Sequence, residues 1–190
     1  MGIGSLTKKK ARRVIGIDSS TKSIAFAVFE DGKPLQCGEV TFVGKTVFER
    51  LLDAKNKVAA LVAAGILRGD YVGVESTVMV RNHQTAIDMA YVLGAVLAEL
   101  MVSNPEVHKF APISWQSGIG NPNLTKTEKD QIINDYPGKS KAWYSDKGRE
   151  IRKQRTLAIA RNHFTIPDGS DNIGDAVGIA LFIQKTLTRP

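Results

Sequence analysis

The sequence contains a single cysteine, Cys37, among 190 residues. One thiol excludes an internal disulfide and any zinc site of the CxxC type. No uninterrupted apolar run approaches the roughly 18 residues of a membrane span, and the basic N-terminus is not followed by the apolar stretch of a secretory signal. These absences predict a soluble, cytoplasmic protein that has no membrane partner.

Acidic residues are missing where basic residues gather. The net charge is +7, and residues 1–17 hold five Lys or Arg and no acid. Residues 139–161 hold eight Lys or Arg and only two acids, so the rest of the chain is mildly acidic. Concentrated cations bind polyanions by releasing condensed counterions, so nucleic acid is the predicted partner. The alternative, that these runs are solvated faces or a tag-like tail, stays open.

Hydrophobic periodicity predicts an α/β fold. Strands are expected at 14–18, 23–30, 33–42, 71–75 and 106–112, and helices at 46–67, 82–103, 149–164 and 173–187. The Asp-Gly pair at 31–32 predicts a hairpin turn between the second and third strands. This order of elements predicts a mixed five-stranded sheet flanked by helices.

The length suits one domain with a substantial core. Residues 1–12 are predicted to be a basic flexible tail, and residues 13–190 a single domain. The helical pattern is lost from 113 to 148, where Gly, Pro, Asn and Lys are frequent. We expect a basic insertion around 117–148, formed as a loop or in part as helix.

Three carboxylates occupy comparable places in this order. Asp18 ends the first strand, Glu75 ends the fourth, and Asp175 lies in the first turn of the last helix. If the first and fourth strands are neighbours, the three side chains meet at one edge, where they repel one another unless cations bind. Oxygen ligands of this kind suit Mg²⁺ or Mn²⁺, and paired ions activate water for phosphodiester cleavage.

Each carboxylate also has an ordinary structural explanation. Asp18 can end its strand in an Asx turn, Glu75 can cap the following loop, and Asp175 can favour the positive end of a helix dipole. Asp171 suits an N-cap, yet it lies four residues before Asp175 and so on the same helical face. The residues alone leave these alternatives open.

Three motifs in order resemble the RuvC-type Holliday junction resolvases of the RNase H-like superfamily. They are "VIGIDSSTKSIAFAVFEDGK", "VGVESTVMVRNHQTAIDMAYVLGAV" and "DNIGDAVGIALFIQK". The resemblance covers about residues 13–110 and 150–187. It implies an RNase H-like fold and a bacterial or phage-infected cell as the setting.

The resemblance also implies a set of metal-binding and catalytic residues. Asp18, Glu75 and Asp175 match the family's acidic ligands of two Mg²⁺ ions, for which Mn²⁺ is expected to substitute. The fourth family ligand falls on Asn172 in this chain, and a carboxylate stands one position earlier at Asp171. Asp171 is the preferred fourth ligand, and Asn172 is the alternative.

Residues for DNA contact follow from the same resemblance. Lys153 matches a basic residue that contacts phosphate, and a second family lysine falls near Gln116 and is absent. Val78 and Met79 stand where bacterial resolvases carry an aromatic wedge. In the insertion, Trp143 and Tyr144 lie among lysines, either to stack on unpaired bases or to pin a surface flap. The full set predicted to bind DNA is Arg81, Asn82, Lys126, Arg152, Lys153 and Arg155.

The function implied is resolution of four-way DNA by paired nicks that leave 5′-phosphates, in recombination and repair. Two nicks need two active sites, which implies a homodimer with the small-residue helix 82–103 as a candidate interface. Cleavage of flaps, forks or other branched DNA, and a YqgF-like role in RNA processing, are the alternatives. A non-catalytic module that binds branched nucleic acid is a more remote one. The first hairpin also resembles that of actin-like kinases, which need a second lobe and a second phosphate loop.

Overall fold

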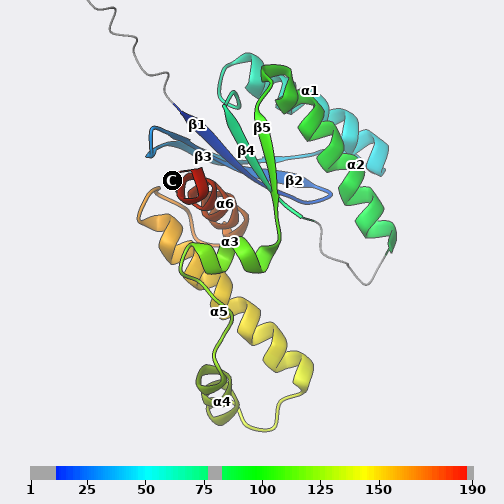
Figure 1. The fold of residues 1–190 in the computed structure, drawn as a ribbon. Helices are drawn as coiled ribbons and strands as arrows, with labels where there is room; N and C mark the ends of the chain where they lie inside the picture. Colours follow the sequence, from blue (N-terminus) through cyan, green and yellow to red (C-terminus); the bar gives the residue numbers. More distant parts are fainter. Residues whose placement is uncertain (1–11, 77–82, 188–190) are drawn as a thin grey trace, which may run out of the picture.

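The computed structural model describes residues 12–76 and 83–187, and its centre is a five-stranded sheet (Figure 1). The strand order is β3-β2-β1-β4-β5, with β1, β2 and β3 antiparallel and β1, β4 and β5 parallel. The strands are β1 (Arg13–Ser19), β2 (Ser23–Glu30), β3 (Lys33–Thr41), β4 (Tyr71–Glu75) and β5 (Glu106–Phe110). The mixed sheet predicted from the sequence is confirmed.

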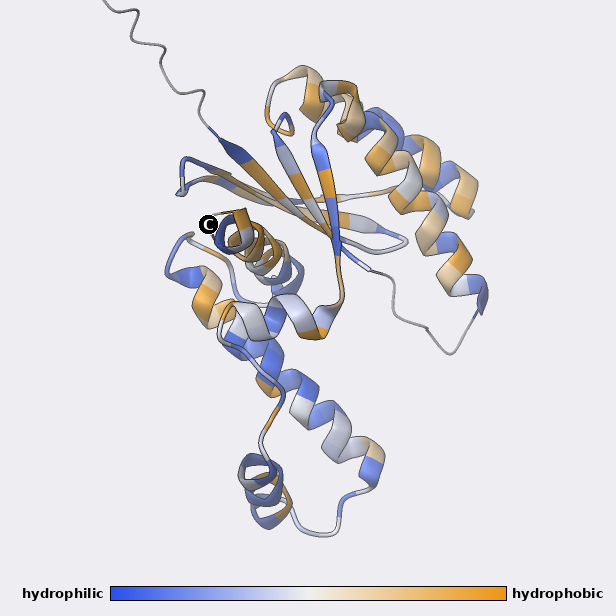
Figure 2. Ribbon diagram, viewed as in Figure 1, coloured by the Kyte–Doolittle hydropathy of each residue, from blue (hydrophilic) through white to orange (hydrophobic). Residues whose placement is uncertain are grey.

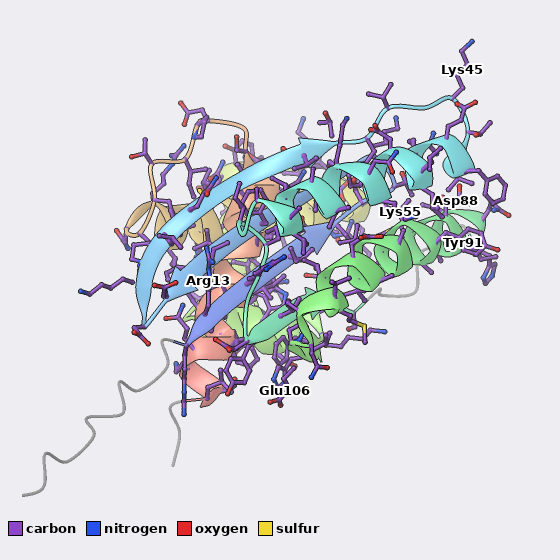
Figure 3. The ribbon with its side chains drawn as sticks, turned by 90° about the horizontal axis from the view of Figure 1, so that it is seen from above. Arg13, Lys45, Lys55, Asp88, Tyr91 and Glu106 are labelled. Atoms are coloured by element: carbon purple, nitrogen blue, oxygen red, sulfur yellow. The ribbon has the colours of Figure 1, made fainter. Side chains whose placement is uncertain are left out.

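Helices cover both faces of this sheet (Figure 1). Two of them, α1 and α2, lie side by side on one face, as Figure 3 shows from above. On the opposite face α6 packs against the strands, and α3 and the second half of α5 pack against α6. The helices are α1 (Val47–Ala63), α2 (His83–Leu100), α3 (Pro112–Gly118), α4 (Lys126–Asp135), α5 (Lys141–Arg161) and α6 (Asp171–Leu187), with a 3₁₀ turn η1 (Met101–Ser103).

Alternation along β1 divides the core into two clusters. Ile15 and Ile17 are fully buried in the cluster beneath α1 and α2. Val14 belongs to the cluster on the α6 side, so residues of even number on this strand point toward α6. The position of Asp18 in this alternation places its side chain on the α6 face.

Two glycines let α6 lie close to the sheet. A Cβ at Gly16 of β1 would lie 2.1 Å from the backbone oxygen of Ala176, and one at Gly73 of β4 would lie 2.3 Å from Ile183 Cδ1. No side chain larger than hydrogen fits at Gly16 without a shift of the helix backbone. This close approach sets the height of α6 above the strands that carry the predicted acids.

The insertion predicted around 117–148 is largely helical. It contains the end of α3, all of α4 and the start of α5, which begins at Lys141 and not near 149. Thr125 and Glu128 form a reciprocal capping box at the start of α4, and the Ser140 hydroxyl caps α5. The last helix likewise begins at Asp171, two residues before the predicted start.

Residues 119–150, here called the arm, project away from the sheet with α4 at the far end (Figure 1). Aromatic side chains fasten the turn between α4 and α5. The Tyr144 hydroxyl donates to the backbone oxygen of Tyr136 at 2.7 Å and accepts from the Lys139 amide at 3.2 Å. Trp143 packs on both tyrosines, with ring centroids 5.1 and 5.5 Å away. These contacts match the pinned flap of the two alternatives for Trp143 and Tyr144.

Helix α2 is more apolar along its length than the search for uninterrupted apolar runs in the sequence indicated. Residues 83–103 form a helical segment long and apolar enough, by length and composition alone, to cross a membrane. One such helix is a weak indication, and Val92, Val96 and Leu100 pack it into the core. Only 17% of the segment is buried, and Figure 2 shows that apolar residues are frequent along α1 and α2. The helix therefore has an apolar face that residues 12–76 and 83–187 leave largely exposed.

Candidate active site

The parallel register of β1 and β4 brings two of the predicted acids together. Ile17 pairs with Val74, so Asp18 and Glu75 each follow by one residue and leave the sheet at the same end. Both lie on the α6 face, because side chains alternate along a strand. Each is partly buried.

Helix α6 places the third predicted acid above this edge. Asp175 lies in the second turn of α6, one residue before Ala176, whose backbone oxygen faces Gly16 of β1. Asp171 lies one helical turn earlier, and its charge contributes to raising the pKa of Asp175. The four predicted carboxylates therefore come from β1, β4 and α6 to one edge of the domain.

Burial and mutual repulsion perturb these carboxyl groups. Burial, followed by the charges of Asp175 and Glu75, raises the pKa of Asp18 to about 8. Burial, followed by the charge of Glu75, raises the pKa of Asp175 to about 7. Because each carboxylate disfavours ionisation of its neighbours, the cluster holds protons at neutral pH unless cations bind.

Basic side chains from α5 lie beside the acids. The Lys153 ammonium is 3.5 Å from Asp171 Oδ2, and its charge lowers the pKa of both Asp18 and Asp175. Arg152 also lowers the pKa of Asp175, and it donates a hydrogen bond to the side-chain oxygen of Gln116. Of the three neighbouring bases predicted to contact DNA, Lys153 and Arg152 lie at the acidic edge.

Asp171 and Asn172 point to different partners. The Asn172 amide donates to Glu39 Oε1 of β3 at 2.9 Å, whereas Asp171 faces Lys153 and, electrostatically, Asp175. The position of Asp171, near Lys153 and Asp175, favours Asp171 over Asn172 as the fourth candidate ligand.

Trp115 is a site residue that the sequence analysis missed. Its indole nitrogen donates to Glu75 Oε2 at 2.9 Å, and the side chain is fully buried. The ring lies against Gly178 of α6, where a Cβ would come within 2.5 Å of it. Burial raises the pKa of Glu75, and the hydrogen bond from Trp115 lowers it in part. Trp115 therefore fixes the Glu75 carboxylate relative to the helix that carries Asp175.

The chemistry of this edge fits a divalent cation. Four carboxylates offer hard oxygen atoms, and at least two of them repel their neighbours strongly. Within residues 12–76 and 83–187, however, no three His, Cys, Asp or Glu side chains form a group that could hold a metal ion. The carboxylates share an edge of the sheet without converging on one point.

The other predicted DNA contacts are scattered. Arg155 forms an ion pair with Glu128 of α4, and Lys126 is exposed at the start of α4 in the arm. Arg81 and Asn82 lie outside the described residues, as do Val78 and Met79. The structure thus brings Arg152 and Lys153 to the acids but not Arg155 or Lys126.

A profile of the family described as crossover junction endodeoxyribonuclease RuvC matches residues 14–134, more than half of the chain. The chain belongs to this family. The predicted enzyme class, an endodeoxyribonuclease of the crossover-junction type, is thereby confirmed. Membership in the RuvC family also implies dependence on a divalent metal.

Two solved RuvC structures from Thermus thermophilus resemble this chain. RuvC in complex with a Holliday junction substrate superposes with a TM-score of 0.64 and 17% identity, covering 92% of this chain and 96% of that one. A second RuvC structure from the same organism superposes with a TM-score of 0.62 and 18% identity, covering 93% of this chain and 97% of that one. At this identity the likeness establishes the fold, and the predicted RNase H-like architecture is confirmed. A search of curated protein sequences finds no match.

Proposed function

We propose that this RuvC-family protein resolves four-way DNA junctions by paired nicks that leave 5′-phosphates. One observation carries the proposal: Asp18, Glu75 and Asp175 reach the same edge of the sheet from β1, β4 and α6. Lys153 stands beside them as a cation suited to a phosphate. Acidic residues for a metal next to a base for the substrate are what phosphodiester cleavage requires.

The proposed metal ligands are Asp18, Glu75, Asp175 and Asp171. The proposed ions are two Mg²⁺, for which Mn²⁺ would substitute, because oxygen donors suit small hard cations. Bound there, the metal would supply an activated water and neutralise charge on the phosphodiester. Asn172 is the lesser candidate, since its amide is engaged by Glu39.

The chain's own residues orient the substrate and the acids. Lys153 and Arg152 hold a phosphate of the strand at the acidic edge, and both favour the ionised form of Asp175. Trp115 holds Glu75 by a hydrogen bond from a fully buried indole, so this carboxylate keeps one orientation. Because Asp18 and Asp175 are partly buried, their electrostatic effects are stronger than at an exposed surface.

A homodimer accounts for both paired nicks and the exposed apolar face of α1 and α2. Phe48 and Leu52 of α1 are 69% and 57% exposed, and Ile87 and Tyr91 of α2 are 44% and 47% exposed. Phe48 and Tyr91 stack with ring centroids 6.3 Å apart, which joins the two helices into one surface. An apolar surface of this kind suits a second copy of the chain.

The decisive experiment replaces Asp18. Asp18→Asn keeps the shape of the side chain and removes its charge, so we expect at least a 1,000-fold loss of cleavage on a synthetic four-way junction with Mg²⁺ or Mn²⁺, on the order of 4 kcal/mol. Junction binding, measured by gel shift without metal, should be retained. Asp31→Asn is the matched control, because Asp31 is exposed in the β2–β3 turn with φ 49°, a conformation that Asn adopts readily.

Full activity of Asp18→Asn would contradict the assignment of the site. The native chain should be assayed side by side on four substrates of equal sequence: a linear duplex, a 5′ flap, a fork and a four-way junction. Equal rates on all four would argue against a dedicated resolvase, and cleavage of RNA in preference to DNA would favour an RNA-processing role.

A further inference from the structure

A groove of about 740 Å³ lies between α4 and α5 in the arm. Its volume falls within the range of small-molecule pockets, about 300 to 1,000 Å³. Neither the metal chemistry nor the dimer proposed above uses it.

The groove has an apolar lining. Leu124 and Ile132 are nearly buried, at 7% and 8% exposure, and Ile133 is 46% exposed at the groove. Tyr144 adds an aromatic ring, which its hydrogen bonds to the backbone of the arm's turn hold in place. On the α5 side Gly148 presents no side chain, and a Cβ there would come within 3.2 Å of Leu124.

The charged residues of the described lining are all cations. Lys129, Lys141, Arg149 and Arg152 line the groove, and none of the described lining residues is a carboxylate. Arg149 lies 3.5 Å from Asp146 at the exposed surface, a pairing that contributes little. Lys129 and Lys141 form no ion pair with any described residue. The groove therefore favours an anionic ligand that also has an apolar face.

Arg152 connects the groove to the acidic edge. It lines the groove, its charge lowers the pKa of Asp175, and the next residue, Lys153, pairs with Asp171. Its Nε atom is buried and has no hydrogen-bond partner among the described residues. A strand held in the groove would thus lead directly to the proposed cleavage site.

We propose that this groove binds an unpaired stretch of the DNA strand next to the phosphodiester that is cut. Bases lie against Ile132, Ile133 and Tyr144, and phosphates lie against Lys129, Lys141 and Arg152. The inference rests on the proposed nuclease function and adds to it a site for single-stranded nucleic acid. A groove that combines cations with an aromatic ring is the usual way proteins hold single strands.

Duplex DNA and protein fit the groove less well. A duplex offers phosphates but keeps its base faces stacked inside, so the apolar lining would remain without a partner. An apolar protein segment would offer no anion to the four cations of the lining. An unpaired strand satisfies both parts of the lining, and strands at the crossover of a branched junction are the ones whose bases can leave the stack.

The test compares two substitutions on α4 in the full chain. Ile133→Glu places a carboxylate in the groove at a side chain exposed enough to be replaced without unfolding. Asn134→Glu is the control, because it introduces the same charge at the next, exposed position, which does not line the groove. Binding of a fluorescent 12-nucleotide oligo-dT and of a 12-base-pair duplex is measured by anisotropy in EDTA.

We expect Ile133→Glu to weaken oligo-dT binding about tenfold or more, and Asn134→Glu to weaken it less than threefold. The two variants should affect duplex binding equally. Cleavage of the four-way junction with Mg²⁺ should fall in Ile133→Glu alone, with the melting temperature of both variants unchanged.

Equal losses of oligo-dT binding in both variants would overturn the proposed binding site in the groove. General electrostatic repulsion by the added charge would then explain both losses. Unchanged oligo-dT binding in Ile133→Glu would overturn it as well. A shift from dimer to monomer in that variant would assign the groove to a second copy of the chain. If the native chain cleaves no branched DNA, the proposed function fails. If the native chain cleaves and Ile133→Glu cleaves equally well, the groove proposal alone fails.

Discussion

At the scale of single residues, the candidate site contains one carboxylate, Glu75, that a hydrogen bond holds in place. Its other carboxylates, Asp18 and Asp175, are perturbed by the charges of their neighbours. Trp115 donates to Glu75 from a fully buried position, so the orientation of Glu75 does not depend on solvent. Asp18 and Asp175 have raised pKa values because of burial and the neighbouring charges. A residue that orients a metal ligand in this way usually tunes metal affinity.

Trp115→Phe should therefore weaken metal use as well as the fold. The change removes the hydrogen bond to Glu75 and keeps an aromatic ring, and we expect a loss of about 1 to 3 kcal/mol in unfolding free energy. The Mg²⁺ concentration for half-maximal cleavage should rise roughly 10-fold or more. The rise in melting temperature on adding Mg²⁺, which needs no cleavage, should shrink in parallel.

Trp143→Phe is the matched control for this change, because Trp143 packs on Tyr136 and Tyr144 at the turn of the arm. Its Mg²⁺ dependence should equal that of the native chain. If Trp115→Phe also keeps the native Mg²⁺ dependence, Trp115 has only a packing role.

At the scale of helices and strands, the core elements were predictable and the arm was not. Strong alternation and helical periodicity marked the five strands and most of α1, α2 and α6. Only the second half of α5 shows such a pattern, because its buried residues Thr156, Leu157 and Ala160 lie near its end, whereas its first half stands in the arm. The capping box at Thr125 and Glu128 was a usable signal for α4 that the periodicity argument passed over.

Helix α2 carries the prediction that belongs to this scale. Ile87→Glu places a charge on the exposed apolar face of α1 and α2, so we expect the dimer to dissociate at least tenfold more readily. The mass in solution, measured by light scattering over a range of concentrations, reports the change.

Ile113→Glu provides the control, since Ile113 of α3 is 43% exposed, close to the 44% of Ile87, but lies on the other side of the sheet. A native chain that remains monomeric at high concentration would remove the dimer from the proposal. Equal dissociation in both variants would mean that added charge alone weakens assembly.

At the scale of the whole molecule, the clustered acids make stability depend on pH. Asp18 and Asp175 bind protons more tightly in the folded chain than in the unfolded chain, with folded pKa values of about 8 and about 7. Without metal, the unfolded state therefore releases protons first as pH rises. The free energy of unfolding should fall between about pH 4 and pH 8, by an amount on the order of a few kcal/mol.

Thermal unfolding in EDTA at pH 5, 6, 7 and 8 measures this slope. Asp18→Asn should flatten it and raise the melting temperature most at pH 8, whereas Asp31→Asn should leave it unchanged. Excess Mg²⁺ should stabilise the native chain most at high pH, because a cation favours the ionised carboxylates. A slope of the same size in Asp18→Asn would show that other groups govern the pH dependence.

Local patterns along the chain were enough to predict the sheet, the order of its strands in the sequence and the three acids at corresponding strand and helix ends. These follow from periodicities of two and 3.6 residues, which act over a few neighbouring positions. The tertiary structure alone decided that Trp115 holds Glu75, 40 positions away, and that Asn172 turns to Glu39, 133 positions away. It also decided the groove of the arm, since contacts between distant segments depend on how α3, α4, α5 and α6 pack and no local pattern encodes them.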